Sequence, residues 1–296
     1  MESQKIQTAT TVEGYLKQAS VRVNAALEKL LPPEDEAPSD LHKAVRYSVF
    51  AGGKRLRPAL ALASFEACNG QGEDIWLATA ALEMTHTFSL IHDDLPCMDN
   101  DDFRRGRPTN HKVFGEALAI LAGDSLLVYA FELLARTKRP ECVATLARAL
   151  GTRGMLGGQV VDIQSEGKQV GLETVNYIHR HKTAALIEAS LVLGAQLADA
   201  DEEVITGFGA FGSRIGLAFQ IVDDVLDLEQ TTEALGKDAG SDVAKGKATY
   251  PAVVGIAASK AMAGQLVEEA KLELRKLPVQ GCILELIADY IITRVH

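Results

Sequence analysis

The sequence predicts an all-α protein, for two reasons. Apolar residues recur at helical spacing through nearly every segment, as Leu186, Leu193 and Leu197 do, and we find no convincing alternating strand pattern. Aromatic residues make up only 5% of the 296 residues while Ala and Leu abound, which is typical of long packed helices. At a typical helix length of about 11–12 residues plus connections, we expect a bundle of about ten helices.

Helix boundaries are predicted where glycine and proline gather. These breaks fall at residues 32–38, 69–72, 96–108, 138–140, 167, 236–246 and 278–281. None of them has the composition of a domain linker, and the sequence holds no low-complexity segment or short repeat. We therefore expect residues 1–296 to form a single domain.

The composition is that of a soluble protein, with 47% hydrophobic and 24% charged residues. A net charge of −10 argues against a nucleic-acid surface. The four cysteines show no CxxC spacing and the first twenty residues lack a signal-peptide core, so we expect a cytoplasmic protein with reduced thiols. The apolar stretch Ala117–Ala135 is interrupted by Asp124 and Glu132, which predicts a helix buried in protein and no stable membrane insertion.

A first acidic motif occupies residues 93–99. A helix from about Ile75 carries Asp93 and Asp94 to its C-terminal end, and Pro96 disfavours helical geometry at the residue before it, so Asp99 should come from the following loop. Asp93 and Asp99 can then converge on shared cations. The alternative, a solvated acidic surface, conflicts with the apolar run before the motif and the arginines after it.

A second acidic motif occupies residues 223–227, in an apolar stretch that reads as helix on both sides. Asp223 and Asp227 are four residues apart and share a helix face with Gln220. Bare carboxylates in such a place are costly unless a positive group neutralises them. Magnesium prefers oxygen ligands and presents its remaining positions to phosphate oxygens, so the two motifs predict a magnesium and diphosphate site.

Basic residues gather in three clusters, each at a predicted helix end. Arg binds phosphate oxygens in a bidentate manner and Lys acts as a point charge, so both suit a diphosphate. Any one cluster alone is more often a solvated surface, but three basic and two acidic clusters together indicate a metal and a polyphosphate. The clusters are Gly52-Gly53-Lys54-Arg55-Leu56-Arg57, Arg104 with Arg105 and Arg107, and Lys237 with Lys245 and Lys247.

Two weaker signals remain. The segment 179–183 opens an apolar helix, where Lys182 would be unusual without an anion. His86 lies two turns before Asp93, and its spacing leaves a structural and a functional interpretation equally open.

Taken together, these features resemble the trans-prenyltransferases, the short-chain isoprenyl diphosphate synthases. The match covers essentially the whole chain in the right order, and the double aspartate-rich pattern is highly specific. The motifs that carry it are Gly-Gly-Lys-Arg-Leu-Arg-Pro at 52–58, the acidic motif at 93–99 with the Arg-Arg-Gly that follows, Gly-Gly-Gln at 157–159 with Asp162, His-Lys-Thr at 181–183, Phe-Gln at 219–220 before the second motif, and Gly-Lys-Ala-Thr-Tyr-Pro at 246–251.

The resemblance implies an isoprenoid synthase fold with helices around a central cleft, and a specific reaction. An allylic diphosphate ionises at its C–O bond, isopentenyl diphosphate attacks the carbocation head-to-tail, and a proton is lost. Three magnesium ions would stabilise the charge on the departing diphosphate. A cleft with apolar walls would exclude water, which otherwise quenches the cation.

The resemblance also implies roles for individual residues. Asp93, Asp99 and Asp223 resemble direct magnesium ligands, with Asp94, Asp224 and Asp227 as supports. The family pattern implies that Arg104, Lys182, Lys237 and Lys247 hold the allylic diphosphate, that Gly53, Lys54, Arg57, His86 and Arg105 hold isopentenyl diphosphate, and that Thr183 and Gln220 stabilise the allylic cation.

Product length is implied by the residue five before the first aspartate, which forms the pocket floor in this family. That residue is Phe88, about 7.5 Å deeper along the helix at 1.5 Å per residue. An aromatic side chain there resembles bacterial farnesyl diphosphate synthases, which extend dimethylallyl diphosphate to geranyl and then farnesyl diphosphate. If Phe88 is plain core, a geranylgeranyl product becomes possible.

Three rival functions compete with that of a farnesyl diphosphate synthase. A geranylgeranyl diphosphate synthase differs in pocket depth at Phe88. A terpene cyclase would not need the second diphosphate site at Lys54, Arg57 and Arg105. A catalytically silent subunit should have lost aspartates or cations that are all present here. The family usually forms homodimers, and the abundant apolar helices permit one.

Overall fold

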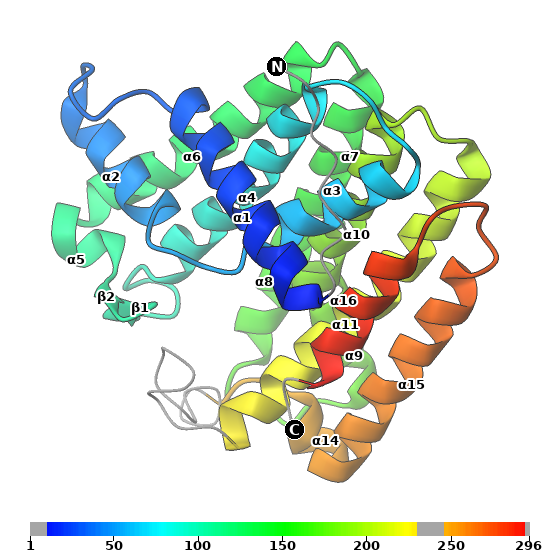
Figure 1. Cartoon of the computed structure of the whole chain (residues 1–296). Coiled ribbons are helices and arrows are strands. Elements are labelled where there is room, and N and C mark those ends of the chain that lie inside the picture. Colours follow the sequence, from blue (N-terminus) through cyan, green and yellow to red (C-terminus); the bar gives the residue numbers. More distant parts are fainter. Residues whose placement is uncertain (1–10, 230–245, 294–296) are drawn as a thin grey trace. The chain divides into compact units, whose positions relative to one another are not determined.

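The computed structural model describes residues 11–229 and 246–293, and these are almost entirely helical (Figure 1). The all-α prediction is therefore confirmed. The described residues hold more helices than the ten or so expected, and among them α5 (Asn110–Phe114), α9 (Leu172–Ile178) and α14 (Tyr250–Val254) are short. The described chain divides into two compact units, and the prediction that residues 1–296 form one domain stays a prediction.

The first unit comprises Met1–Ala59 and Gly72–Pro140. Its centre is helix α4, whose Ala- and Leu-rich sequence is buried along most of its length and packs most extensively against α6. Helices α1 and α2 also pack on α4, and a two-stranded hairpin lies between α4 and α5. Besides α5, the elements of this unit are α1 (Val12–Leu30), α2 (Ser39–Val49), the start of α3 (Leu56–Ala67), α4 (Asp74–Asp93), β1 (Phe103–Arg104), β2 (Arg107–Pro108) and α6 (Glu116–Arg136).

The short hairpin is an element for which the sequence showed no strand pattern. Phe103 pairs with Pro108 and Arg104 with Arg107, across a turn in which Arg105 and Gly106 have φ values of 53° and 73°. Two residues per strand are too few for an alternating pattern to show in the sequence. Arg104 therefore lies on β1, Arg105 in the turn and Arg107 on β2, although the three are nearly consecutive in the chain.

The second unit comprises Leu60–Gln71 and Glu141–His296, and its centre is the long helix α11 (Glu202–Glu229). Gly212 and Gly216 let α11 approach its neighbours closely, because a Cβ at either position would lie 2.7 Å from the Cα of Glu188 or Ala184. The other helices of this unit are α7 (Pro140–Leu150), α8 (Met155–Ser165), α10 (Ala185–Leu197), α15 (Ile256–Leu274) and α16 (Cys282–Thr293).

The sequence predicted that residues 179–183 begin a helix, and this prediction is wrong. They form a π-helical segment, η1 (His179–Ala184), that joins α9 to α10 without a break, so the helical run already begins at Leu172. π-Helical turns depend on tertiary context and occur often at functional sites.

Helices α6 and α11 are each long and apolar enough to cross a membrane, a property that buried helices of soluble proteins share. The predicted burial of the stretch in α6 holds for one face only. Ala119, Leu126 and Ala130 are buried, whereas Leu121 and Val128 are exposed.

Candidate active-site residues in the two units

The first acidic motif lies where α4 ends. The helix ends at Asp93, and the backbone N–H of Asp99 donates to the carbonyl oxygen of Asp93 over 2.8 Å. This bond turns the loop back on the helix end, so Asp99 comes from the loop as expected and its backbone lies beside that of Asp93. Both side chains are partly exposed and offer the carboxylate oxygens that magnesium prefers.

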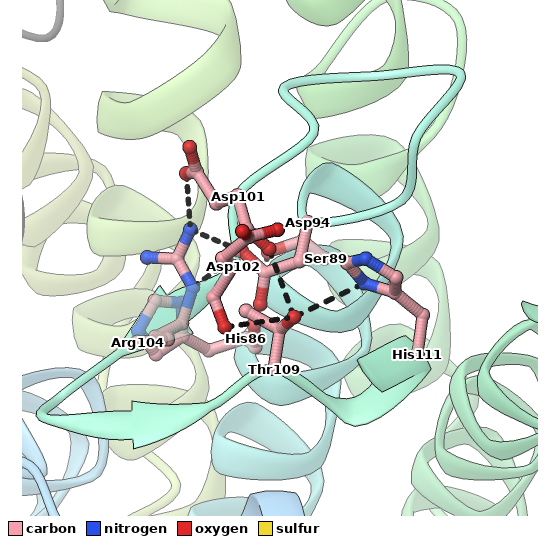
Figure 2. A network of polar contacts seen from close by, with 8 residues as sticks. All are labelled: His86, Ser89, Asp94, Asp101, Asp102, Arg104, Thr109 and His111. Atoms are coloured by element: carbon pink, nitrogen blue, oxygen red, sulfur yellow. Dashed lines mark hydrogen bonds and ion pairs between the residues drawn. The ribbon is translucent and has the colours of Figure 1, made fainter. Parts of the chain in front are cut away.

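Asp94 points into the protein and binds Arg104 of the hairpin (Figure 2). Its Oδ1 atom lies 2.7 Å from Nε and 2.5 Å from Nη2 of Arg104, which also lies 3.5 Å from Asp101. Burial raises the pKa of the Asp94 carboxyl to about 6, although the bond to Arg104 opposes this shift. Asp94 thus holds Arg104, and both its implied role as a metal support and the predicted contact of Arg104 with a diphosphate stay predictions.

A glycine turn before α3 receives Arg105. Gly52 and Gly53 have φ values of 95° and 119°, and the Arg105 guanidinium donates to the carbonyl oxygen of Gly52. A Cβ on Gly53 would lie 2.6 Å from Cζ of Arg105, and the φ value of 119° independently favours glycine at this position. The structure therefore brings Gly53 and Arg105 together, and the exposed Lys54 follows Gly53 in the chain.

His86 on α4 lies in a strongly positive environment. Burial lowers the pKa of its imidazole well below 6.5, and four arginines lower it further. These are Arg57, Arg105, Arg104 and Arg55, in order of decreasing effect. Two of the cations predicted for isopentenyl diphosphate, Arg57 and Arg105, therefore act on this histidine, and the functional interpretation of His86 stays a prediction.

In the second unit, Lys182 of η1 meets a buried carboxylate. Its Nζ atom lies 2.5 Å from Oδ2 of Asp162 on α8, and Nζ of Lys247 lies 4.0 Å from the same oxygen. The anion expected near Lys182 is thus supplied by the protein itself. Gly158 allows the close approach, since a Cβ there would lie 2.3 Å from the backbone nitrogen of Lys182. Lys237 and Lys245 lie outside the described residues.

Thr183 and Gln220 meet directly in the second unit. The Thr183 hydroxyl donates to Oε1 of Gln220 over 2.8 Å, and the Gln220 amide donates to Oδ1 of Asp224 over 3.0 Å. Asp224 is buried, and its Oδ2 lies 2.7 Å from Nε2 of His179 and accepts from the backbone N–H of Tyr250 over 2.9 Å. Asp224 thus links α11 to His179 and Tyr250, and its implied role as a metal support stays a prediction.

Sequence reasoning gave no individual role to Arg55, which it only counted in a basic cluster, and none to His179 or Tyr250. Arg55 is buried and paired with Glu83, whereas the sequence shows it only as one of several cations in a turn. His179 and Tyr250 support Asp224 from segments distant in sequence. Only the His-Lys-Thr and Thr-Tyr-Pro neighbourhoods could have pointed to them.

The second acidic motif divides its carboxylates by burial. Asp223 is half-buried, whereas Asp227 is 1% exposed. Within the described residues, no group of three or more His, Cys, Asp or Glu side chains is gathered closely enough to hold a metal ion. The predicted ligands Asp93, Asp99 and Asp223 fit magnesium by chemistry, because all are hard oxygen donors.

Phe88 is buried in the first unit. It is 4% exposed, and its ring meets that of His92 edge to face, with centroids 5.4 Å apart and an interplanar angle of 84°. Nε2 of His92 in turn lies 3.1 Å from the carbonyl oxygen of Ile120 on α6. The predicted floor residue is therefore held in place on α4 by a neighbour that contacts α6.

Comparison with known proteins now places the chain. Residues 38–276 match the polyprenyl synthetase family. The chain is 50% identical to a dimethylallyltranstransferase of Fischerella ambigua, over 95% of this chain and 83% of that protein. It is 48% identical to a geranylgeranyl diphosphate synthase of Cyanophora paradoxa, over 98% of both.

Solved structures agree. An FPP/GFPP synthase of Zymomonas mobilis superposes with a TM-score of 0.84 at 34% identity, covering 95% of this chain and 98% of that one. A polyprenyl synthase of Caulobacter crescentus, complexed with calcium and isoprenyl diphosphate, gives 0.88 at 27% identity, covering 99% and 100%. The chain therefore belongs to the polyprenyl synthetase family and is a prenyltransferase.

Proposed function

We propose that this prenyltransferase condenses isopentenyl diphosphate with dimethylallyl and then geranyl diphosphate to give farnesyl diphosphate. The observation that carries the proposal is the cationic cluster around His86. Its arginines and glycine turn form an anion site in addition to the lysines of the second unit, as a reaction between two diphosphates requires. A terpene cyclase, with one diphosphate substrate, would have no use for it.

The cluster in the first unit is assigned to isopentenyl diphosphate. Arg57 and Arg105 supply charge, Lys54 is exposed beside them, and the glycine turn allows close approach of backbone to phosphate. His86 is neutral in the absence of ligand because its pKa is lowered, so it binds by hydrogen bonding until a diphosphate raises that pKa. The double bond of the bound substrate is the nucleophile.

The allylic diphosphate is assigned to Arg104, Lys182 and Lys247, together with Lys237. In the structure Lys182 is paired with Asp162, so the diphosphate must compete with a carboxylate that the protein already supplies. The oxygen lone pairs of Thr183 and Gln220 stabilise the allylic cation. The C–O bond breaks, the new C–C bond forms, and the departing diphosphate takes the proton.

Three magnesium ions are assigned to Asp93, Asp99 and Asp223. Enzymes of this family are in general magnesium-dependent. When bound, magnesium supplies positive charge that stabilises the departing diphosphate. Asp94 and Asp224 hold other groups and act as supports, and Asp227 is buried on α11.

The farnesyl product is proposed from Phe88. A buried aromatic ring one and a half turns before Asp93 would stop a chain about 7.5 Å below the metal ligand. The second candidate is a geranylgeranyl product, because the relative from Cyanophora paradoxa and one from Capsicum annuum, 45% identical, are geranylgeranyl synthases.

A product assay tests the proposal. The purified protein is incubated with magnesium, dimethylallyl diphosphate and excess isopentenyl diphosphate, and the dephosphorylated alcohols are sized by mass spectrometry. Farnesol is expected, and geranylgeraniol from Phe88→Ala or the milder Phe88→Leu. Phe208→Leu, a matched loss in the core of the second unit, should keep the wild-type product. Geranylgeraniol from the wild type would refute the farnesyl product, and no product would favour a silent subunit.

We also propose a cytoplasmic homodimer. Ile120, Leu121 and Val128 are 42%, 53% and 67% exposed on α6, a concentration of apolar surface that a second copy would cover. A relative 48% identical is a large subunit of a heterodimeric synthase. Light scattering should give twice the chain mass of 31.8 kDa, and Leu121→Asp with Val128→Asp should give a monomer.

A further inference from the structure

The three cations at the glycine turn and the start of α3 differ in how deeply they are buried. Lys54 is exposed and Arg57 is half-buried, whereas Arg55 is 3% exposed. Arg55 makes three hydrogen bonds: Nη1 to Oε1 of Glu83 over 2.5 Å, Nη2 to the carbonyl oxygen of Val49 over 2.6 Å, and Nε to Oδ1 of Asn24 over 2.9 Å. The partners belong to α4, α2 and α1, so one side chain ties three helices to the turn.

The contribution of the Arg55–Glu83 ion pair to stability does not by itself explain why the pair is buried. Both side chains are almost fully buried, and taking a guanidinium and a carboxylate out of water offsets much of their attraction. An apolar pair would stabilise the same place about as well. The pair therefore has to be judged by what it positions.

Its position connects the two halves of the cationic cluster. Glu83 lies three residues before His86 on α4 and therefore one turn away on the same side of the helix. Arg55 follows Lys54 directly and precedes Arg57 by two residues. The pair thus joins the turn that carries the lysine and arginine to the helix that carries the histidine.

The backbone of the turn needs such a support. Gly52, Gly53 and Arg55 all have positive φ values, and at 50° Arg55 adopts a conformation that side chains rarely take. A residue stays in this region only where its surroundings hold it there. The three hydrogen bonds of the Arg55 side chain supply that restraint.

We propose that Arg55 is a positioning residue for the isopentenyl diphosphate subsite. By pairing with Glu83 it fixes the turn against α4, so that Lys54, Arg57 and His86 face one diphosphate. This inference rests on the proposed function. A purely electrostatic role makes the opposite prediction for Glu83, because removing its negative charge from a cationic cluster would strengthen the binding of an anion.

Steady-state kinetics with each substrate varied in turn test the inference. Arg55→Lys keeps the charge but loses the three-way geometry, and Glu83→Gln keeps the shape but loses the ion pair. Each should raise the KM for isopentenyl diphosphate on the order of tenfold, as losing an orienting partner typically does, with kcat and the allylic KM within about twofold. Asn24→Ala, which leaves no charge unpaired, should raise the same KM about threefold.

Arg46→Lys is the matched control, since Arg46 pairs with Glu28 in the same unit and its bonds do not involve the turn. Its kinetic constants should equal those of the wild type. If Arg55→Lys does not fold, Asn24→Ala and Glu83→Gln carry the test. An unchanged KM in folded variants, or a lower KM in Glu83→Gln, would overturn the inference alone. A wild-type protein that does not consume isopentenyl diphosphate would overturn the proposed function as well.

Discussion

In the first acidic motif Asp94 is neutralised by an arginine, whereas its counterpart in the second motif, Asp224, is held by an imidazole, a side-chain amide and a backbone amide. The first lies at the end of α4, and its partner Arg104 keeps 28% of its side chain exposed. The second lies within a long packed helix, and its partner His179 is 4% exposed. Two motifs that look alike in sequence are therefore held by different interactions, one by a partly exposed ion pair and the other by buried hydrogen bonds.

The difference indicates where each motif tolerates change. An ion pair at a helix end can exchange its partner for water or a diphosphate, because one side of it is already solvated. A buried carboxylate whose acceptors are all used cannot lose one without leaving a donor unsatisfied. We expect the first motif to adapt to ligands and the second to act as a fixed support.

The largest effect should come from the proposed metal ligands, where the two motifs behave alike. Asp93→Ala and Asp223→Ala should each lower kcat roughly 10³-fold or more, because each removes an oxygen ligand from magnesium. Diphosphate release measured at saturating magnesium checks this. A loss below tenfold for either variant would remove that residue from the metal site.

A smaller loss of activity is expected from Gly158→Ala, because Gly158 packs against the backbone of Lys182. Gly158→Ala would place a Cβ 2.3 Å from the Lys182 nitrogen, and neither backbone can rotate away. The resulting displacement of about 1 Å should lower kcat/KM for the allylic substrate on the order of 10²-fold. Gly264→Ala, on α15 with nothing within 4 Å, should leave activity unchanged and stabilise the helix by about 0.5–1 kcal/mol.

The contrast between the two supports is tested by stability. Asp224→Asn loses acceptor capacity among buried donors, and the free energy of unfolding should fall by about 2 kcal/mol. Asp94→Asn leaves Arg104 able to reach water, and the loss should be about half as large. Urea denaturation measures both, and equal losses would remove the distinction drawn here.

The smallest effect is a pH dependence from His86. Burial and four arginines keep its pKa below 6.5 in the folded chain, so the unfolded chain binds the extra proton as the pH falls. The free energy of unfolding therefore falls as the pH drops through the pKa of the unfolded histidine, about 6.5, by roughly 1 kcal/mol between pH 7.5 and 5.5. His86→Gln should lack this increment, and identical pH profiles for the variant and the wild type would show that His86 titrates normally.

Much of the first unit could be predicted from sequence because its signals are local. The helix expected from about Ile75 begins at Asp74, and Pro96 places Asp99 in the loop. The π-helical segment and the hairpin could not, since one depends on packing and the other has two residues per strand. The inward turn of Arg55 was missed because its partner Glu83 lies 28 residues away.

We propose that both acidic motifs bind magnesium for the ionisation of the allylic diphosphate. Product formation from dimethylallyl and isopentenyl diphosphate should therefore be measured after stripping the protein with EDTA and then titrating magnesium. We predict no product without metal and a sigmoidal return of activity, because we propose that more than one ion binds. Full activity in the absence of divalent metal would contradict the account.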